Sequence, residues 1–181
     1  KPQEQDSKYF RRLTKLYIPA VVSLLRMDVQ LEGAQQLPKD GRFLLICNHL
    51  NILDPVLLLG CFPEAQLAFI SKRENADMFL IGKIMHRLMC QLINREALKT
   101  ILKCIQMIRE DQVSVAVFPE GYTSRDGKLH HFRSGVFKIA TKTHVPIVMC
   151  TVKNTQNLFH NIKRQKKTVV PLHVVGVIQP E

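Results

Sequence analysis

Short apolar runs alternate with longer segments whose apolar residues recur every three or four positions along this 181-residue chain. Short runs are typical of buried strands and the longer segments of helices, so their order predicts an α/β domain. We expect a single domain with a largely parallel or mixed sheet flanked by helices. Strands are expected at residues 42–47, 66–70, 113–118, 146–152 and 168–178, and helices at residues 75–92, 97–109 and 134–143.

Two details of this pattern bear on the site. Pro171 interrupts the last apolar run, which indicates an edge strand or a bent strand, because proline donates no hydrogen bond to a neighbouring strand. The segments 48–54 and 119–133 follow expected strands. Loops in that position are where an open α/β sheet usually binds its ligand.

The composition supports a packed core and excludes several other classes of protein. Hydrophobic residues make up 46% of the chain and charged residues 23%, which excludes a disordered or collagen-like chain. The five cysteines lie far apart and form no C-x-x-C pair, so they predict reduced thiols facing the cytosol rather than disulfides. We expect no metal site, because neither the cysteines nor the histidines show metal-ligand spacing.

The chain is strongly basic, with a formal net charge of +11. Residues 125–167 carry ten basic residues and one acidic residue, Asp126, so an anionic partner is expected. Nucleic acid and anionic lipid both qualify by charge. Nucleic acid is the weaker interpretation, because the chain has three Tyr, no Trp and no basic motif interleaved with aromatic residues. The cations at 163–167 are either a solvated loop or a contact with anionic lipid headgroups.

The N-terminal part resembles a membrane-surface segment. No stretch of 18 or more uncharged apolar residues is present, so no spanning helix is expected. Residues 16–25 are apolar and follow Arg11, Arg12 and Lys15, a pattern typical of an N-terminal amphipathic membrane-surface helix. A helix packed on the core is the alternative. We expect residues 1–30 to contact the membrane and residues 31–181 to form the catalytic domain, and an upstream anchor could precede Lys1.

The first candidate constellation is His49-x-x-x-x-Asp54. His49 lies in the loop after an expected strand, and Asp54 lies at the cap of a helix whose first turn holds Pro55, so the two side chains can converge. An imidazole held by a carboxylate can take a proton from a hydroxyl. No G-x-S-x-G motif supplies a nucleophile, so the attacking oxygen would belong to the substrate. A structural histidine beside an ordinary helix cap is the alternative.

The second candidate constellation is Phe118-Pro119-Glu120-Gly121, which ends a buried strand and opens a basic loop. A glycine there lets backbone N–H groups approach an anion, and the neighbouring cations would hold a phosphate. The alternative is a Pro-Gly turn followed by a solvated run of charges.

Four motifs in this order resemble those of the glycerolipid acyltransferases, the family typified by 1-acyl-sn-glycerol-3-phosphate acyltransferase. Their order and spacing match the family across most of the chain, from about residue 42 to residue 178. The motifs are Asn48-His49 through Asp54, Ile93-Asn94-Arg95, Phe118-Pro119-Glu120-Gly121 and Val145-Pro146-Ile147-Val148. Four ordered motifs are far more specific than any one of them.

The resemblance implies transfer of a fatty acyl group from acyl-CoA or acyl-ACP (acyl carrier protein) to the hydroxyl of a lysophospholipid. The expected acceptor is 1-acyl-sn-glycerol 3-phosphate and the expected product phosphatidic acid, with no cofactor beyond the acyl donor. The resemblance assigns His49 as the base and Asp54 as its support. It also implies an enzyme associated with an anionic membrane at the cytosolic face, the inner membrane if the source is bacterial. The implied substrate-binding residues are Arg95 on the phosphate, Glu120, Gly121, Lys72 and Arg125.

The chain departs from the family pattern after Gly121. The family has Thr-Arg where this chain has Tyr122-Thr123, so the expected phosphate-binding Arg is missing. Arg125, Lys128 or Arg133 could replace it. Two alternatives therefore stay open: a lysophospholipid with another headgroup, and a catalytically silent lipid-binding homologue. The second is disfavoured because His49 and Asp54 are both present.

Overall fold

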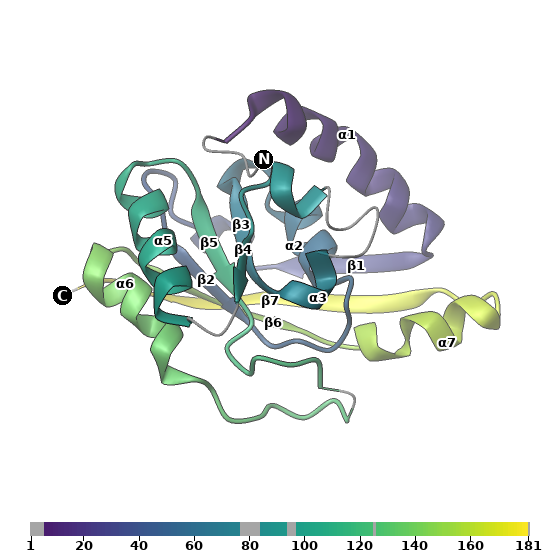
Figure 1. Ribbon diagram of the computed structural model, residues 1–181. Helices are drawn as coiled ribbons and strands as arrows, with labels where there is room; N and C mark the ends of the chain where they lie inside the picture. Colours follow the sequence, from purple (N-terminus) through teal and green to yellow (C-terminus); the bar gives the residue numbers. More distant parts are fainter. Residues whose placement is uncertain (1–5, 77–83, 94–96, 125, 181) are drawn as a thin grey trace.

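The computed structural model describes residues 6–76, 84–93, 97–124 and 126–180, which form an α/β fold around one sheet (Figure 1). Its strands lie side by side in the order β1-β7-β6-β2-β5-β3-β4. Their bounds are β1 (Met27–Glu32), β2 (Leu44–Cys47), β3 (Leu67–Lys72), β4 (Gln91–Ile93), β5 (Ser114–Val117), β6 (Ile147–Val152) and β7 (Thr168–Ile178). The predicted α/β fold with a largely parallel or mixed sheet is confirmed.

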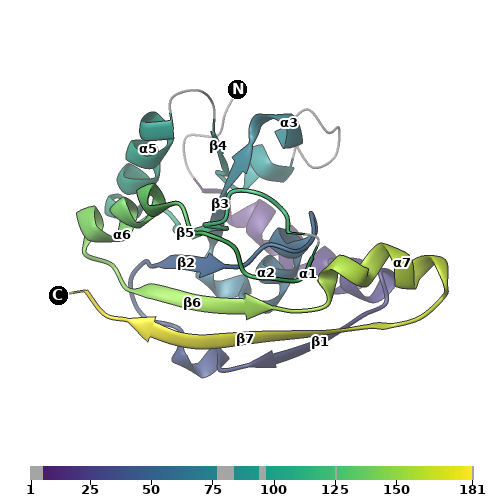
Figure 2. The ribbon, with the colours of Figure 1, turned by 90° about the horizontal axis from the view of Figure 1, so that it is seen from below.

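The directions of the strands bring several loops to one edge of the sheet. Strands β6, β2, β5, β3 and β4 are parallel, whereas β7 is antiparallel to β6 and β1 is parallel to β7. Figure 2 shows β2 and β6 running toward α7 while β1 and β7 run back. The carboxyl ends of the five parallel strands therefore share an edge with the amino ends of β1 and β7.

Helices cover both faces of the sheet. They are α1 (Lys8–Leu24), α2 (Asp54–Cys61), α3 (Arg73–Ala76), α5 (Ala97–Arg109), α6 (Lys138–Thr143) and α7 (Leu158–Lys163), with short 3-10 turns at η1 (Ala34–Gln36), η2 (Pro63–Ala65), η3 (Ser134–Phe137) and η4 (Thr155–Asn157). Strand β2 shows why two layers are needed. Leu45 and Cys47 belong to the core under α2, whereas Leu44 and Ile46 belong to the core under α5 and α6. Because side chains alternate along a strand, a fully apolar β2 requires cover on both faces.

Two predicted elements differ from the structure. The helix expected at residues 75–92 ends early: residues 77–83 lie outside the described part, Met89 adopts a left-handed φ of 59°, and Leu92 pairs with Ser71 as part of β4. A left-handed residue ends a helix, and neither the run of apolar residues nor its spacing signals one.

Pro171 was expected to mark an edge strand or a bent strand, and the edge position is wrong. Strand β7 is continuous and lies between β1 and β6. The carbonyl of Pro171 accepts a hydrogen bond from Lys153 N at 3.0 Å, and Lys153 is one residue past the end of β6. Because the N and O atoms of a strand residue point to the same neighbour, the missing N–H falls where β6 has already ended.

The N-terminal helix packs on the domain by one face. Ile18 is buried against Gly60 of α2, whose added Cβ would lie 2.7 Å from Ile18 Cγ2. Other apolar side chains of α1 are exposed, among them Leu16, Tyr17 and Leu24. The boundary expected at residue 30 falls inside β1. Among the described residues, no helix is both long and apolar enough to cross a membrane.

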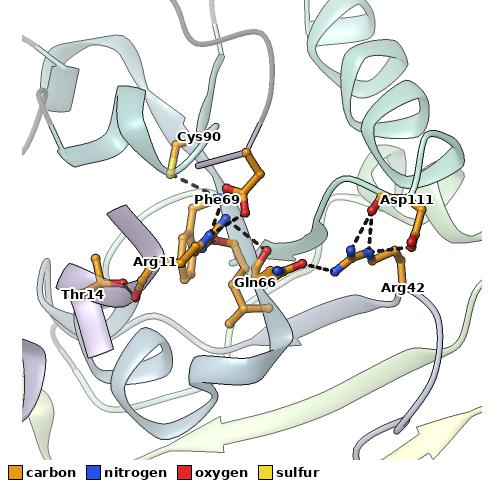
Figure 3. A network of polar contacts seen from close by, with 9 residues as sticks. Arg11, Thr14, Arg42, Gln66, Phe69, Cys90 and Asp111 are labelled. Carbon is orange, nitrogen blue, oxygen red and sulfur yellow. Dashed lines mark hydrogen bonds and ion pairs between the residues drawn. The ribbon is translucent and has the colours of Figure 1, made fainter. Parts of the chain in front are cut away.

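Arg11 anchors α1 to the amino end of β3, as Figure 3 shows. Its guanidinium is buried, forms an ion pair with Asp6 at 3.0 Å, and donates to the carbonyl of Leu67 at 2.7 Å and that of Gln66 at 3.2 Å. The side chain of Gln66 in turn accepts from Arg42 at 2.6 Å. The contacts lie at the start of β3, at the opposite edge from the loops that carry the candidate site residues.

Candidate active site

The carboxyl edge of the sheet brings the two candidate constellations together. His49 lies two residues after β2, and Glu120 lies three residues after the neighbouring strand β5. The two loops are bonded to each other, because Ser124 N donates to the carbonyl of His49 at 2.7 Å. The sequence placed both segments in loops after strands, and the parallel pairing of β2 with β5 makes these loops neighbours.

His49 and Asp54 converge, as their spacing predicted. The Nδ1 atom of His49 lies 2.9 Å from Asp54 Oδ2. The carboxylate can only accept a hydrogen bond, so Nδ1 carries the proton and Nε2 keeps a free lone pair. The imidazole also stacks on the ring of Phe118, with centroids 4.1 Å apart and planes 20° apart. One ring orientation is therefore held by a polar contact and an aromatic contact, and Nε2 is free to accept a proton.

The carboxylate of Asp54 is held by the loop that carries His49. Its Oδ2 atom accepts from Leu50 N at 2.7 Å and from Asn51 N at 2.8 Å, as well as from the imidazole. Its Oδ1 atom is buried and finds no donor among the described residues, and the residue is only 1% exposed. Two backbone N–H groups of the loop therefore hold Oδ2 of Asp54 against the imidazole.

Asp54 is not the capping residue that the sequence predicted. The cap position of α2 is Leu53, and no side chain caps this helix; Asp54 is its first residue and Pro55 follows. The carboxylate turns back toward the loop because two backbone N–H groups and the imidazole there bond to it. Pro55 in the first turn matches the prediction.

Two asparagines hold the His49 loop through contacts that no sequence pattern predicted. Asn48 pairs with the backbone of Val152 at the end of β6, donating to its carbonyl at 2.9 Å and accepting from its N–H at 2.8 Å. Asn51 is buried and donates to the carbonyl of Thr155 at 2.8 Å. Both contacts span 104 residues, so only the sheet topology places the partners together.

Glu120 binds backbone rather than presenting its carboxylate to solvent. Its Oε1 atom accepts from His49 N at 3.1 Å, and its Oε2 atom accepts from His130 N at 3.0 Å. Only 1% of the residue is exposed. Each oxygen of the carboxylate therefore has a backbone donor and is covered.

Gly121 adopts a conformation that favours glycine, with φ of 76°. A Cβ atom there would lie 2.6 Å from Nε of Arg133, so the missing side chain lets Arg133 approach the backbone. The N–H of Gly121 donates to the carbonyl of Phe118 at 3.0 Å, so this N–H is already used within the turn. A side chain at this position would displace Arg133.

The remaining candidate residues are cations. Lys72 ends β3 at the same edge of the sheet and is exposed, as are Lys128 and Arg133 in the loop after β5. Arg95 and Arg125 lie outside the described residues. Within the described part, no group of three or more His, Cys, Asp or Glu side chains could hold a metal ion.

A second histidine–carboxylate pair, which was not predicted from the sequence, lies in the loop after β5. Nε2 of His130 is 3.0 Å from Asp126 Oδ1, and the same oxygen accepts from the buried Ser124 hydroxyl at 2.6 Å and from Lys128 N at 3.0 Å. The spacing of four residues between the pair was its only signal. These bonds give the basic loop a defined shape beside His49.

Comparison with known proteins identifies the family. The sequence profile described as Acyltransferase matches residues 28–153, which include His49, Asp54, Glu120 and Gly121. The chain belongs to the acyltransferase family. The matched region runs from β1 to just past the end of β6 and so contains both loops of the site.

Named acyltransferases are similar over most of the chain. A probable 1-acyl-sn-glycerol-3-phosphate acyltransferase from Mycoplasma pneumoniae is 30% identical over 176 residues, which is 93% of this chain and 64% of that protein. The human 1-acyl-sn-glycerol-3-phosphate acyltransferase beta is 32% identical over 146 residues, or 78% of this chain and 51% of that protein. The chain thus spans less than two thirds of the length of these relatives.

A solved acyltransferase shares the fold. The crystal structure of the 1-acyl-sn-glycerophosphate (LPA) acyltransferase PlsC from Thermotoga maritima superposes with a TM-score of 0.79 at 28% sequence identity. The match covers 96% of this chain and 70% of that one. The mixed sheet described above is therefore the fold of an acyltransferase.

Proposed function

We propose that the chain transfers a fatty acyl group from acyl-CoA or acyl-ACP to the free hydroxyl of a lysophospholipid. The observation that carries this proposal is the contact of His49 Nδ1 with Asp54 Oδ2 at 2.9 Å, which leaves Nε2 as a proton acceptor. The family membership and the names of the relatives support the same reaction.

In the proposed mechanism His49 acts as a general base. The acceptor hydroxyl oxygen attacks the thioester carbonyl carbon while its proton passes to His49 Nε2, and the charge of Asp54 stabilises the resulting imidazolium. The tetrahedral intermediate then collapses: the C–S bond breaks, the new ester remains, and the leaving thiolate takes the proton from Nε2. General base catalysis of this kind is worth about 10²–10⁴-fold in rate. No cofactor is needed beyond the acyl donor.

We propose 1-acyl-sn-glycerol 3-phosphate as the acceptor and phosphatidic acid as the product. The two negative charges of the phosphate need cations to bind them. Among the described residues, Lys72 ends β3, and Lys128 and Arg133 follow β5, at the same edge of the sheet as His49. Arg95 and Arg125 complete the proposed set on the strength of the family resemblance. Glu120 and Gly121 contribute to acceptor binding through the shape of the loop, since Gly121 makes room for Arg133.

The proposed enzyme works at an anionic membrane, on the cytosolic face, and on the inner membrane if the source is bacterial. Residues 1–30 are the proposed membrane-contact segment and residues 31–181 the proposed acyltransferase domain. In support, α1 exposes Leu16, Tyr17 and Leu24, and carries the exposed cations Arg12 and Lys15. Helices with this combination bind membrane surfaces.

The test is release of free thiol from acyl-CoA, and separately from acyl-ACP, by the purified chain on anionic vesicles. The acceptor panel contains 1-acyl-sn-glycerol 3-phosphate, lysophospholipids with other headgroups, and glycerol 3-phosphate, with His49→Ala as the control. The proposal predicts release that depends on 1-acyl-sn-glycerol 3-phosphate and disappears in His49→Ala. Release with another lysophospholipid alone would correct the headgroup. No release with any acceptor, from a folded and vesicle-bound chain, would favour a silent lipid-binding protein.

A further inference from the structure

Five consecutive residues, 163–167, run from the last residue of α7 to the residue before β7 and are here called the basic turn. All five side chains are exposed, and four are cationic: Lys163, Arg164, Lys166 and Lys167. The backbone of the turn is well defined, because Arg164 N and Lys166 N both donate to the carbonyl of Asn161, at 3.1 and 2.9 Å. The four charges are therefore presented on a fixed frame.

Arg26, which lies between α1 and β1, is bonded to the basic turn and to the first residue of β7. The guanidinium of Arg26 donates to the carbonyl of Gln165, and Thr168 N donates to the carbonyl of Arg26 at 2.9 Å. Figure 1 shows the end of α1 and the end of α7 at the same side of the molecule. Arg26 thus adds a fifth cation to the surface. Within the described part of the chain, none of the five cations forms an ion pair with a carboxylate.

Exposed apolar side chains flank these cations. Leu24, two residues before Arg26, is 82% exposed, and Tyr17 lies two turns earlier on the same face of α1. On α7, Phe159 is 50% exposed and lies four residues before Lys163, so the two share a face. Cations that surround exposed apolar side chains are the combination that binds the interface of an anionic bilayer.

This surface lies at the same edge of the sheet as the candidate active site. Strands β1 and β7 begin where β2 and β6 end (Figure 2). The loop that carries His49 is bonded to the segment leading into α7, through Asn51 and the carbonyl of Thr155 at 2.8 Å. A bilayer seated on the basic turn would therefore lie on the side of the molecule that carries the candidate active site.

We propose that the basic turn, Arg26 and the exposed side chains Leu24 and Phe159 form one docking surface for an anionic lipid bilayer. The surface combines these five positive charges with apolar side chains that insert among lipid chains. The inference deepens the proposed function in one respect, because it brings the site to the bilayer that holds the lysophospholipid. The contact with lipid itself does not depend on catalysis.

The test measures binding of the purified chain, without substrate, to vesicles of neutral phosphatidylcholine and to vesicles that also contain phosphatidylglycerol. The test variant combines Lys163→Gln, Lys166→Gln and Lys167→Gln. The matched control combines Lys103→Gln, Lys138→Gln and Lys142→Gln, which removes the same charge from exposed lysines of α5 and α6. A second variant, Phe159→Ser, tests the apolar contact. Circular dichroism checks that every variant is folded.

Each cation near an anionic surface strengthens binding about fivefold, so the test variant should bind anionic vesicles about a hundredfold more weakly. The control should stay within about threefold of the parent chain, and Phe159→Ser should weaken binding about tenfold. Equal losses in test and control variants, or equal binding to neutral vesicles, would overturn the proposal. Stronger binding to a single-stranded oligonucleotide than to anionic vesicles would also overturn it. Because no turnover is measured, these results are independent of whether acyl transfer is found.

Discussion

The backbone N–H of His49 donates to Oε1 of Glu120 at 3.1 Å, although the two residues are 71 positions apart in the chain. The other oxygen of the same carboxylate accepts from His130 N. One buried side chain therefore joins the loop after β2 to the loop after β5. Catalysis depends on the position of reacting groups, so Glu120 is expected to act on the rate through the backbone of His49.

Replacement of Glu120 by Gln tests this positioning. The glutamine amide can accept a hydrogen bond only through its oxygen. Its NH₂ group would therefore face one of the two backbone N–H donors, His49 N or His130 N. We expect the free energy of unfolding to fall by about 1.5–3 kcal/mol, the value of a hydrogen bond to a charged group. We also expect kcat to fall more than about tenfold, and KM for the acceptor to rise by a smaller factor, because Glu120 shapes the acceptor-binding loop without touching the acceptor. Steady-state kinetics and urea unfolding measure both effects, with exposed Glu64→Gln as the control. A rise in KM alone would mean that Glu120 contacts the acceptor.

Part of this site could be predicted from the sequence. Short apolar runs located the strands, and the loops after them held both motifs. The convergence of His49 with Asp54 followed from a loop residue next to a helix start. The contacts of Glu120, Asn48 and Asn51 could not be predicted, because each depends on which strands are neighbours in the sheet. Strand order is set by packing of the whole domain, and no local pattern encodes it.

Strands β1 and β4 were not predicted from the sequence, and each omission has a local reason. Strand β1 (Met27–Glu32) alternates polar and apolar residues on an exposed edge and has only Met27 fully buried, so it gives no apolar run. Strand β4 (Gln91–Ile93) is three residues long and follows a segment with helical spacing. Pro171 indicated an edge strand, whereas it lies inside the sheet opposite the point where β6 stops.

Arg11 is expected to be far more important for stability than its neighbour Arg12. Burial lowers the pKa of Arg11, while the ion pair with Asp6 and two carbonyl contacts hold the charge in place. Arg11→Met removes the ion-pair partner of Asp6 and the donor to both carbonyls, so the free energy of unfolding should fall by about 3 kcal/mol. Arg12 is exposed, and Arg12→Met should change it by less than about 0.5 kcal/mol. Denaturant unfolding of both variants measures the difference; similar values would contradict the anchoring role.

The native thiols are expected to react slowly. Burial raises the pKa of Cys61 and Cys90 to about 11 and that of Cys104 and Cys150 to about 12, and it raises the pKa of Cys47 well above its usual range. The thiolate is the reactive form, and a free cysteine has a pKa of about 8.5. At neutral pH the folded chain should react with a disulfide reagent more than about a hundredfold more slowly than the unfolded chain. Fast reaction of any one thiol in the folded chain would contradict this.

Asp126 is expected to make the stability of the folded chain depend on pH. Bonds from the Ser124 hydroxyl, the Lys128 N–H and His130 lower the pKa of Asp126 below its ordinary value of 3.8. A carboxyl whose folded pKa is depressed contributes stability that is present above the unfolded pKa and is lost as pH falls toward the folded pKa. The melting temperature should thus drop more steeply below about pH 4 in the parent chain than in Asp126→Asn. Identical slopes of melting temperature against pH in the parent chain and in Asp126→Asn would contradict this expectation.

The central claim is that His49, held by Asp54, takes the proton of the acceptor hydroxyl. The most direct test is the rate of phosphatidic acid formation from 1-acyl-sn-glycerol 3-phosphate and acyl-CoA on anionic vesicles, for the parent chain, His49→Gln and Asp54→Asn. Both variants should fold and bind vesicles as the parent does, and both should lose at least about a hundredfold in kcat. If His49→Gln formed product within tenfold of the parent rate, His49 would not be the base.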